Sequence, residues 1–255
     1  MLKNIQRISI IIVIILLINS ICFATNSGIT LPTIEIGVNN EATPQETAAT
    51  LKIIILLTVL ALAPSILIMM TSFTRIIIIL SFLRNALGTQ QMPPNQILTG
   101  LALFLTLFIM TPTFTEINQN AFTPYMAGEV TQSEALERAK TPIKNFMLSQ
   151  MRGEEELSLF MNLSNVEAKA ATELPLTIII PAFVLNELKI AFQMGFILYI
   201  PFLVIDMIVA STLMSMGMMM LPPVTISLPF KILLFVLVDG WNLVITSMIT
   251  GFRLG

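Results

Sequence analysis

Ionisable side chains inside long apolar stretches are the residues of this 255-residue chain whose chemistry most needs an explanation. Burying a charge at membrane depth costs free energy, so such groups usually pair with one another or line an aqueous path. Five lie in the C-terminal part of the chain: Glu187, Lys189, Asp206, Lys231 and Asp239. Three roles are open to the two aspartates, namely a buried pair, a contact between subunits and a proton relay. A pair such as Asp206 with Lys231 is favoured, because the sequence lacks the repeated carboxylates of a pump.

A methionine cluster is the second notable feature. Five methionines fall within residues 214–220, beside Gly217 and the Pro222-Pro223 pair: Met214, Met216, Met218, Met219 and Met220. Methionine is unbranched and polarizable, so it repacks around irregular shapes. The cluster indicates a deformable apolar constriction, and simple gap-filling between lipid-embedded helices is the alternative that the sequence leaves open.

The chain lacks the residues that several classes of chemistry require. The chain has no His and a single cysteine, Cys22, so the usual zinc, haem and Ser/His or Cys/His catalytic arrangements are not expected. Thirteen Lys and Arg against fifteen Asp and Glu leave no basic stripe that would neutralise phosphates. We therefore expect no enzyme, no cofactor and no nucleic-acid partner.

The composition predicts an all-α membrane protein. Hydrophobic residues make up 55% of the chain, charged residues 11%, and the mean hydropathy is +0.88. An average soluble domain is roughly one quarter charged. We expect kinked or broken transmembrane helical hairpins with a small helical extracytoplasmic domain.

The N-terminal segment has the order of a secretory signal peptide. Lys3 and Arg7 precede the apolar run at 8–18, and small residues follow up to Ala24. We predict a signal peptide at 1–24, cleaved after Ala24, and an exposed tether at 25–49. An uncleaved first membrane helix is the alternative, although its apolar run is short for a span of about 20 residues.

Residues 50–115 predict a first membrane hairpin. Leu51–Met70 forms its first helix, kinked at Pro64, and a second apolar helix begins at Ile97 after a loop at 88–96 that is expected to be cytoplasmic. Arg75 and Arg84 are expected to be cytoplasmic-side anchors, because positive charges favour the cytoplasmic side.

Residues 116–175 and 176–255 differ in character. The first range is acidic with periodic apolar residues, which predicts an extracytoplasmic domain of short helices, one starting at Thr141-Pro142. The second is apolar and contains Pro181 and Pro201, so either two passes or one long broken helix fits it. The methionine-rich loop at 214–223 follows, then a last span at 226–249. Hydropathy does not fix the number of crossings: a four-span count after signal removal puts the acidic domain and the C-terminus outside, and the segments at Ile76 and Leu203 could each add a half-pass.

Two long stretches resemble the FliP family of flagellar biosynthetic proteins. Residues 62–110 contain the string MTSFTRIIIILSFLRNALGTQQMPPNQ, and residues 183–241 contain FQMGF, IPFLVID, MSMGMMMLPP and LPFK. Together they cover more than a hundred residues, and strings of this length are highly specific. The N-terminal tether and the acidic domain match only in position and character.

The resemblance implies a non-enzymatic core subunit of the type III secretion export gate. About five copies would assemble with the FliQ and FliR proteins into a helical, cone-shaped pore, partly above the bilayer plane. Other export-apparatus membrane proteins, membrane lipids and unfolded exported polypeptides would be its partners, in the bacterial inner membrane at the flagellar basal body. The resemblance further implies a channel gasket formed by Met216, Met218, Met219 and Met220.

Three alternatives stand beside this interpretation. Injectisome export-gate subunits share the core motifs, but they tend to be shorter and to lack the leader. A secondary transporter for a small solute usually shows internal repeats, and no convincing repeat relates the halves of this chain. An inert assembly scaffold without a pore of its own is the third.

Overall fold

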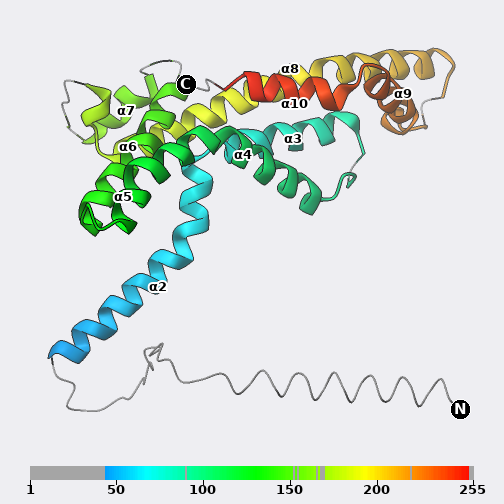
Figure 1. Cartoon of the computed structure of the whole chain (residues 1–255). Coiled ribbons are helices and arrows are strands. Elements are labelled where there is room, and N and C mark those ends of the chain that lie inside the picture. The colour runs from blue at the N-terminus through cyan, green and yellow to red at the C-terminus, as the bar shows by residue number, and fades with distance from the viewer. Residues whose placement is uncertain are drawn as a thin grey trace, which may run out of the picture. The chain divides into compact units, whose positions relative to one another are not determined.

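The described part of the chain is helical throughout. The computed structural model describes residues 44–89, 91–151, 153, 155–164, 166, 170–218 and 220–252, and no strand occurs among them (Figure 1). The expected all-α membrane fold is therefore confirmed. The signal peptide at 1–24 and most of the tether lie outside the described residues, so both stay predictions.

The chain divides into two compact units, Met1–Ile53 and Ile54–Gly255. Of the first unit the structure describes only residues 44–53, which form the start of α2 (Pro44–Met70). This helix begins inside the range expected to be a tether. Proline is well suited to a first helical turn, because its missing N–H has no partner there.

A short helical hairpin opens the core of the second unit. It consists of α3 (Phe73–Leu87) and α4 (Asn95–Ile117). Gly88 ends α3 with φ of 74°, a left-handed conformation that glycine adopts without strain. The loop between the helices falls in the predicted range, with the Pro93-Pro94 pair directly before α4.

The acidic segment folds into short helices, as its periodicity predicts. After α4 come the π-helical turn η1 (Asn118–Phe122), α5 (Thr123–Met126), α6 (Gln132–Gln150), α7 (Glu155–Ser164) and the 3₁₀ turn η2 (Ala171–Glu173). The helix start predicted at Thr141-Pro142 is wrong. Helix α6 begins at Gln132, because Thr131 Oγ1 accepts a hydrogen bond from the Glu134 amide at 3.3 Å and caps it.

The apolar C-terminal region contains one very long helix and a bent pair. Helix α8 (Leu176–Ser215) is continuous over 40 residues although it includes Pro181 and Pro201. Each proline removes only one backbone donor, and packing against neighbouring helices stabilises the remaining backbone hydrogen bonds of α8. The last predicted span is two helices, α9 (Pro223–Leu237) and α10 (Gly240–Thr250), with an angle of 64° between them.

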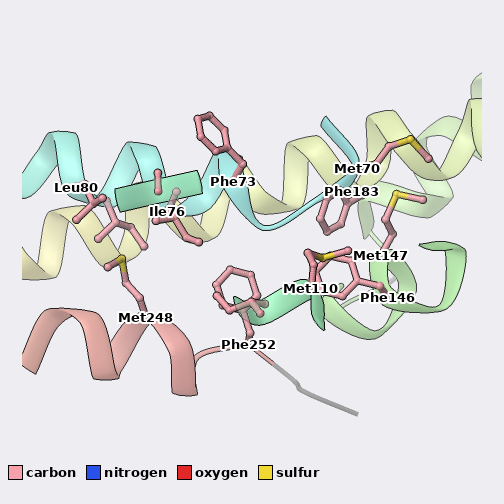
Figure 2. Close-up of a cluster of buried hydrophobic side chains, with 14 of the residues drawn as sticks. Met70, Phe73, Ile76, Leu80, Met110, Phe146, Met147, Phe183, Met248 and Phe252 are labelled. Carbon is pink, nitrogen blue, oxygen red and sulfur yellow. The ribbon is translucent and has the colours of Figure 1, made fainter. Parts of the chain in front are cut away.

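The core of the second unit forms where α3 lies along α8. These two helices make the most extensive contact, α4 and α9 also contact α3, and α6 and α7 contact α8 (Figure 1). Arg75 pairs with Glu187, and Phe82 contacts Phe192 farther along, so the two helices run in the same direction. Figure 2 shows apolar side chains of this core: Ile76 and Leu80 lie toward Met248 of α10, and Phe183 lies beside Phe146 of α6.

Two described helices are long and apolar enough to cross a membrane. They are the continuous segment Asn95–Met126 and α8, and the bent pair α9–α10 is a third candidate if it counts as one span. Residues Thr50–Ile66 of α2 form a shorter apolar stretch. The four-span count stays a prediction.

Candidate functional site

The methionine-rich turn joins α8 to α9 and exposes its side chains. Met214 and Met216 are 64% and 61% exposed, Met218 is 47% exposed and Met220 is 99% exposed. Gly217 makes the turn with φ of 74°, and a Cβ added there would meet no atom within 4 Å. Met219 lies outside the described residues. Exposed apolar clusters of this kind are typical of protein-interaction, ligand-binding or membrane-contacting surfaces.

An apolar hollow lies between α8 and α9 beside this turn. It has a volume of about 470 Å³, and its walls carry only one polar side chain, Thr212. Its lining comprises Ile205, Ile208, Val209, Thr212, Leu213, Met216, Ile226 and Phe230. Met216 is the methionine of the turn that lines this hollow.

A buried ion pair fixes the start of α3 to α8. Arg75 Nε donates to Glu187 Oε2 at 2.8 Å, and Arg75 Nη2 donates to the other carboxylate oxygen. Arg75 Nη1 also donates to the Gly251 carbonyl at 3.3 Å, and its guanidinium lies 3.9 Å from the centre of the Phe252 ring. The two charged side chains are 1% and 0% exposed. Arg75 is therefore not a helix-end cation in water, as an anchor would be.

A second buried pair connects α8 and α9. Lys231 Nζ donates to Asp206 Oδ2 at 2.6 Å and to the Ala86 carbonyl at the end of α3 at 3.2 Å. Ser227 donates to the other oxygen of Asp206. This is the pair that the sequence named as one possibility for Asp206. It holds the base of the methionine-rich turn against α3.

The remaining candidate charges lie at helix surfaces. Lys189 Nζ bonds to Glu155 and Glu156 of α7, at 3.1 Å and 3.0 Å, and it is half exposed. The hydrogen bond from Lys189 lowers the pKa of Glu156 below its ordinary value of 4.5. Arg84 Nη1 donates to Asn95 Oδ1 at 2.5 Å and so connects the ends of α3 and α4.

Asp239 lies at the bend between α9 and α10. It is exposed, and its carboxylate accepts a hydrogen bond from Asn242 Nδ2 at 3.1 Å. Among the described residues, neither an ion pair of Asp239 nor a cluster of His, Cys, Asp and Glu that could hold a metal ion is found.

The charged side chains of α8 are held by residues of neighbouring helices. Glu187 and Asp206, the two acids of α8, are each neutralised by a cation from another helix. Such pairs stabilise the relative positions of helices, because breaking one leaves an uncompensated buried charge. The methionine-rich turn thus lies at the end of a helix that two ion pairs join to its neighbours.

Comparison with known proteins assigns this architecture to a family. The FliP family matches residues 56–248, which span the helices from α2 to α10. The chain belongs to the FliP family. The flagellar biosynthetic protein FliP of Bacillus subtilis (strain 168) is 56% identical over 218 residues, covering 85% of this chain and 98% of the relative.

Other FliP proteins are similar over comparable lengths. FliP of Pectobacterium carotovorum subsp. carotovorum is 52% identical over 200 residues, covering 78% of this chain and 77% of the relative. FliP of Aquifex aeolicus (strain VF5) is 49% identical over 206 residues, covering 80% of this chain and 86% of the relative. These matches confirm the resemblance and the function in flagellum biogenesis. This FliP-family chain is accordingly a membrane protein of flagellar biosynthesis.

Proposed function

We propose that this FliP-family chain is a pore-forming subunit of the flagellar type III protein export gate. Several copies would surround a channel together with FliQ and FliR proteins in the inner membrane at the flagellar basal body. The exposed methionine-rich turn is the observation that carries the proposal. The names of the relatives support the flagellar branch rather than an injectisome.

The turn has the properties that a seal for an export channel requires. Such a channel passes unfolded polypeptides and yet holds ions back when it is empty. A narrow apolar constriction excludes ions by dewetting. Met218 and Met220 are exposed, and their unbranched thioether chains can repack around a polypeptide of any sequence.

The surroundings of the turn supply its support. The Asp206–Lys231 pair joins α8, α9 and the end of α3, roughly two helical turns from the methionine-rich turn along α8 and α9. The apolar hollow between α8 and α9 lets methionine side chains withdraw. A movable seal on a fixed base follows from these two features.

Conductance of a membrane containing the assembled complex tests the proposal. Replacing Met218, Met219 and Met220 together with Ala shortens the seal, and the paired charges that hold the helices are untouched. We expect complexes that still assemble but leak small ions, with reduced or poorly controlled export. Met207→Ala is the matched control, because Met207 is 64% exposed on α8 outside the turn and its loss should leave the closed state tight. An unchanged closed-state leak in verified triple-mutant complexes would remove the gasket role.

A further inference from the structure

Helix α10 carries one polar stripe on an otherwise apolar helix. Asp239, Asn242, Thr246 and Thr250 recur at spacings of three and four residues, and all four are exposed. Asn242 Nδ2 donates to Asp239 at 3.1 Å, and Thr246 Oγ1 donates to Asn242 Oδ1 at 3.1 Å. The opposite face is buried in the core, where Val244 is 3% exposed. The stripe is therefore a continuous hydrogen-bonded surface that faces away from the chain.

The stripe lies in a shallow groove with apolar flanks. The groove has a volume of about 330 Å³ and is lined by Val238, Asp239, Asn242, Leu243, Thr246, Ser247 and Thr250. Val238 and Leu243, which border the polar residues, are 52% and 56% exposed. All its lining residues come from α10 and the two residues before it, with polar groups along the centre and apolar groups beside them.

Asp239 differs from the two acids of α8 in its charge balance. Glu187 and Asp206 each form an ion pair within the chain, whereas no Lys or Arg of the described residues pairs with Asp239. Its backbone has φ of 50°, a left-handed conformation that few residues other than glycine adopt. The bend therefore holds this carboxylate at the head of the stripe.

Three surroundings are conceivable for this surface, and two fit poorly. Lipid would leave the carboxylate at membrane depth without a cation, which is costly. Water would solvate Asp239 but would also expose Val238 and Leu243 on either side. A helix with a basic side chain would neutralise the charge, bond to the polar stripe and cover both flanks. We propose that the α10 stripe is the docking surface for a helix of another subunit that carries Lys or Arg opposite Asp239.

Thiol accessibility in the detergent-extracted complex tests whether the stripe is covered. In a Cys22→Ser background, Ser247→Cys places a nearly isosteric thiol in the groove, and Ser158→Cys on exposed α7 is the matched control. For each cysteine, the rate of labelling by a charged maleimide in the complex is divided by the rate for the same cysteine in denaturant. We expect the ratio at 247 to be at least about tenfold lower than at 158, the factor that about 1.4 kcal/mol of contact gives. Equal ratios would mean a water-filled surface and overturn the proposal.

Photo-crosslinking identifies the occupant. A benzophenone amino acid in place of Leu243 reacts with whatever lies against the flank of the stripe, and mass spectrometry locates the adduct. We expect an adduct on a helix of another subunit, with a Lys or Arg within about one helical turn, 3.6 residues, of the reacted position. Adducts on lipid alone, or on a segment without a basic residue, would refute the proposed partner.

Removing the charge completes the test. Asp239→Asn retains a residue that tolerates left-handed backbone and should weaken co-purification of the cross-linked subunit by at least roughly tenfold. In the complex that already carries Asp239→Asn, we then replace by Gln the basic residue that cross-linking has located. This should weaken co-purification little further, because the same interaction has already been removed. Additive losses would show that the two groups do not pair. This proposal concerns assembly and stands whether or not the methionine-rich turn seals a channel.

Discussion

At the scale of single residues, the Arg75–Glu187 pair shows how a buried charge can be structural. The guanidinium bonds to the carboxylate at both oxygens, to a backbone carbonyl and to the face of Phe252. Removing both charges from water costs free energy, and only a geometry with several hydrogen bonds offsets it. The pair therefore contributes specificity to the packing of α3, α8 and the end of α10.

Breaking this pair should destabilise the protein strongly. We expect Arg75→Ala or Glu187→Gln to lower the free energy of unfolding by about 3–5 kcal/mol, because each breaks a buried charge pair. Arg75→Lys should recover little, since lysine cannot bond to both oxygens. Denaturant unfolding in detergent measures the change, and Arg138→Ala, which breaks an exposed pair with Glu134, serves as the control. A loss as small as that of the control would contradict the structural role.

The sequence predicts the Asp206–Lys231 pair more readily than the Arg75–Glu187 pair. Asp206 and Lys231 lie on consecutive helices in apolar surroundings, so the pair could be named as an example. Arg75 and Glu187 are 112 residues apart, and no periodicity states which helices will lie side by side. Arg75 was therefore interpreted as an anchor at the cytoplasmic side. The signal that was available is its position directly before an apolar run, where a lone cation needs a partner.

At the scale of elements, α3 and α8 approach each other closely at Gly195. A Cβ built on Gly195 would lie 2.6 Å from the Phe82 ring and 3.1 Å from the Phe82 Cβ. Phe82 is also held by an edge contact with Phe192, whose ring centre is 5.4 Å away. The two helices can pack at this separation only because one of them has no side chain here.

Gly195→Ala should therefore separate α3 from α8. We expect a loss of about 1–3 kcal/mol in stability, as for other overpacked cores, and partial recovery with Phe82→Leu. Gly100→Ala is the matched control, because Gly100 is also helical and has nothing within 4 Å. It should be neutral or stabilising by up to about 1 kcal/mol. Thermal unfolding of the three variants decides, and equal losses at 195 and 100 would exclude a packing cause.

The contact between α7 and α8 should weaken in acid. The pKa of Glu156 is lowered in the folded protein by the hydrogen bond from Lys189. A lowered pKa means that the carboxylate stabilises the contact above pH 4.5, its ordinary value, and loses this effect as the pH falls through the folded value. Hydrogen exchange of the α7 amides should accelerate selectively below pH 4.5, and Glu156→Gln should abolish that dependence. An unchanged pH profile in the variant would contradict this assignment.

Sequence patterns predict that a segment is helical better than they predict the residues at which the helix begins and ends. Apolar periodicity predicts short helices in the acidic segment, but it does not mark the start of α6, which the separate Thr131-to-Glu134 capping pattern sets. Pro181 and Pro201 suggested a broken helix, whereas α8 is continuous. A proline's effect depends on whether neighbouring helices hold the chain straight, and that information lies in tertiary packing.

At the scale of the whole molecule, the length of α8 limits how the chain can meet a bilayer. Forty residues at 1.5 Å per residue extend about 60 Å, which is about twice the 30 Å hydrocarbon core. The Arg75–Glu187 pair lies near one end of α8 and the Asp206–Lys231 pair near the other. The two pairs themselves are about 29 Å apart along the helix, so both fit within one hydrocarbon layer, but the full length of α8 does not unless the helix is strongly tilted.

We therefore expect only part of α8 to contact lipid. Spin labels at exposed positions along α8, such as Thr177, Gln193, Ile197 and Ser211, report oxygen access from lipid and access of a water-soluble nickel chelate. The positions with high oxygen access should fall within one continuous window of about 20 residues, because a helix of that length fills the core. Labels beyond the window should be reached by the chelate or covered by another subunit. Lipid access along the entire exposed face of α8 would instead require a helix lying along the membrane plane, and it would contradict a support that carries the methionine-rich turn out of the lipid.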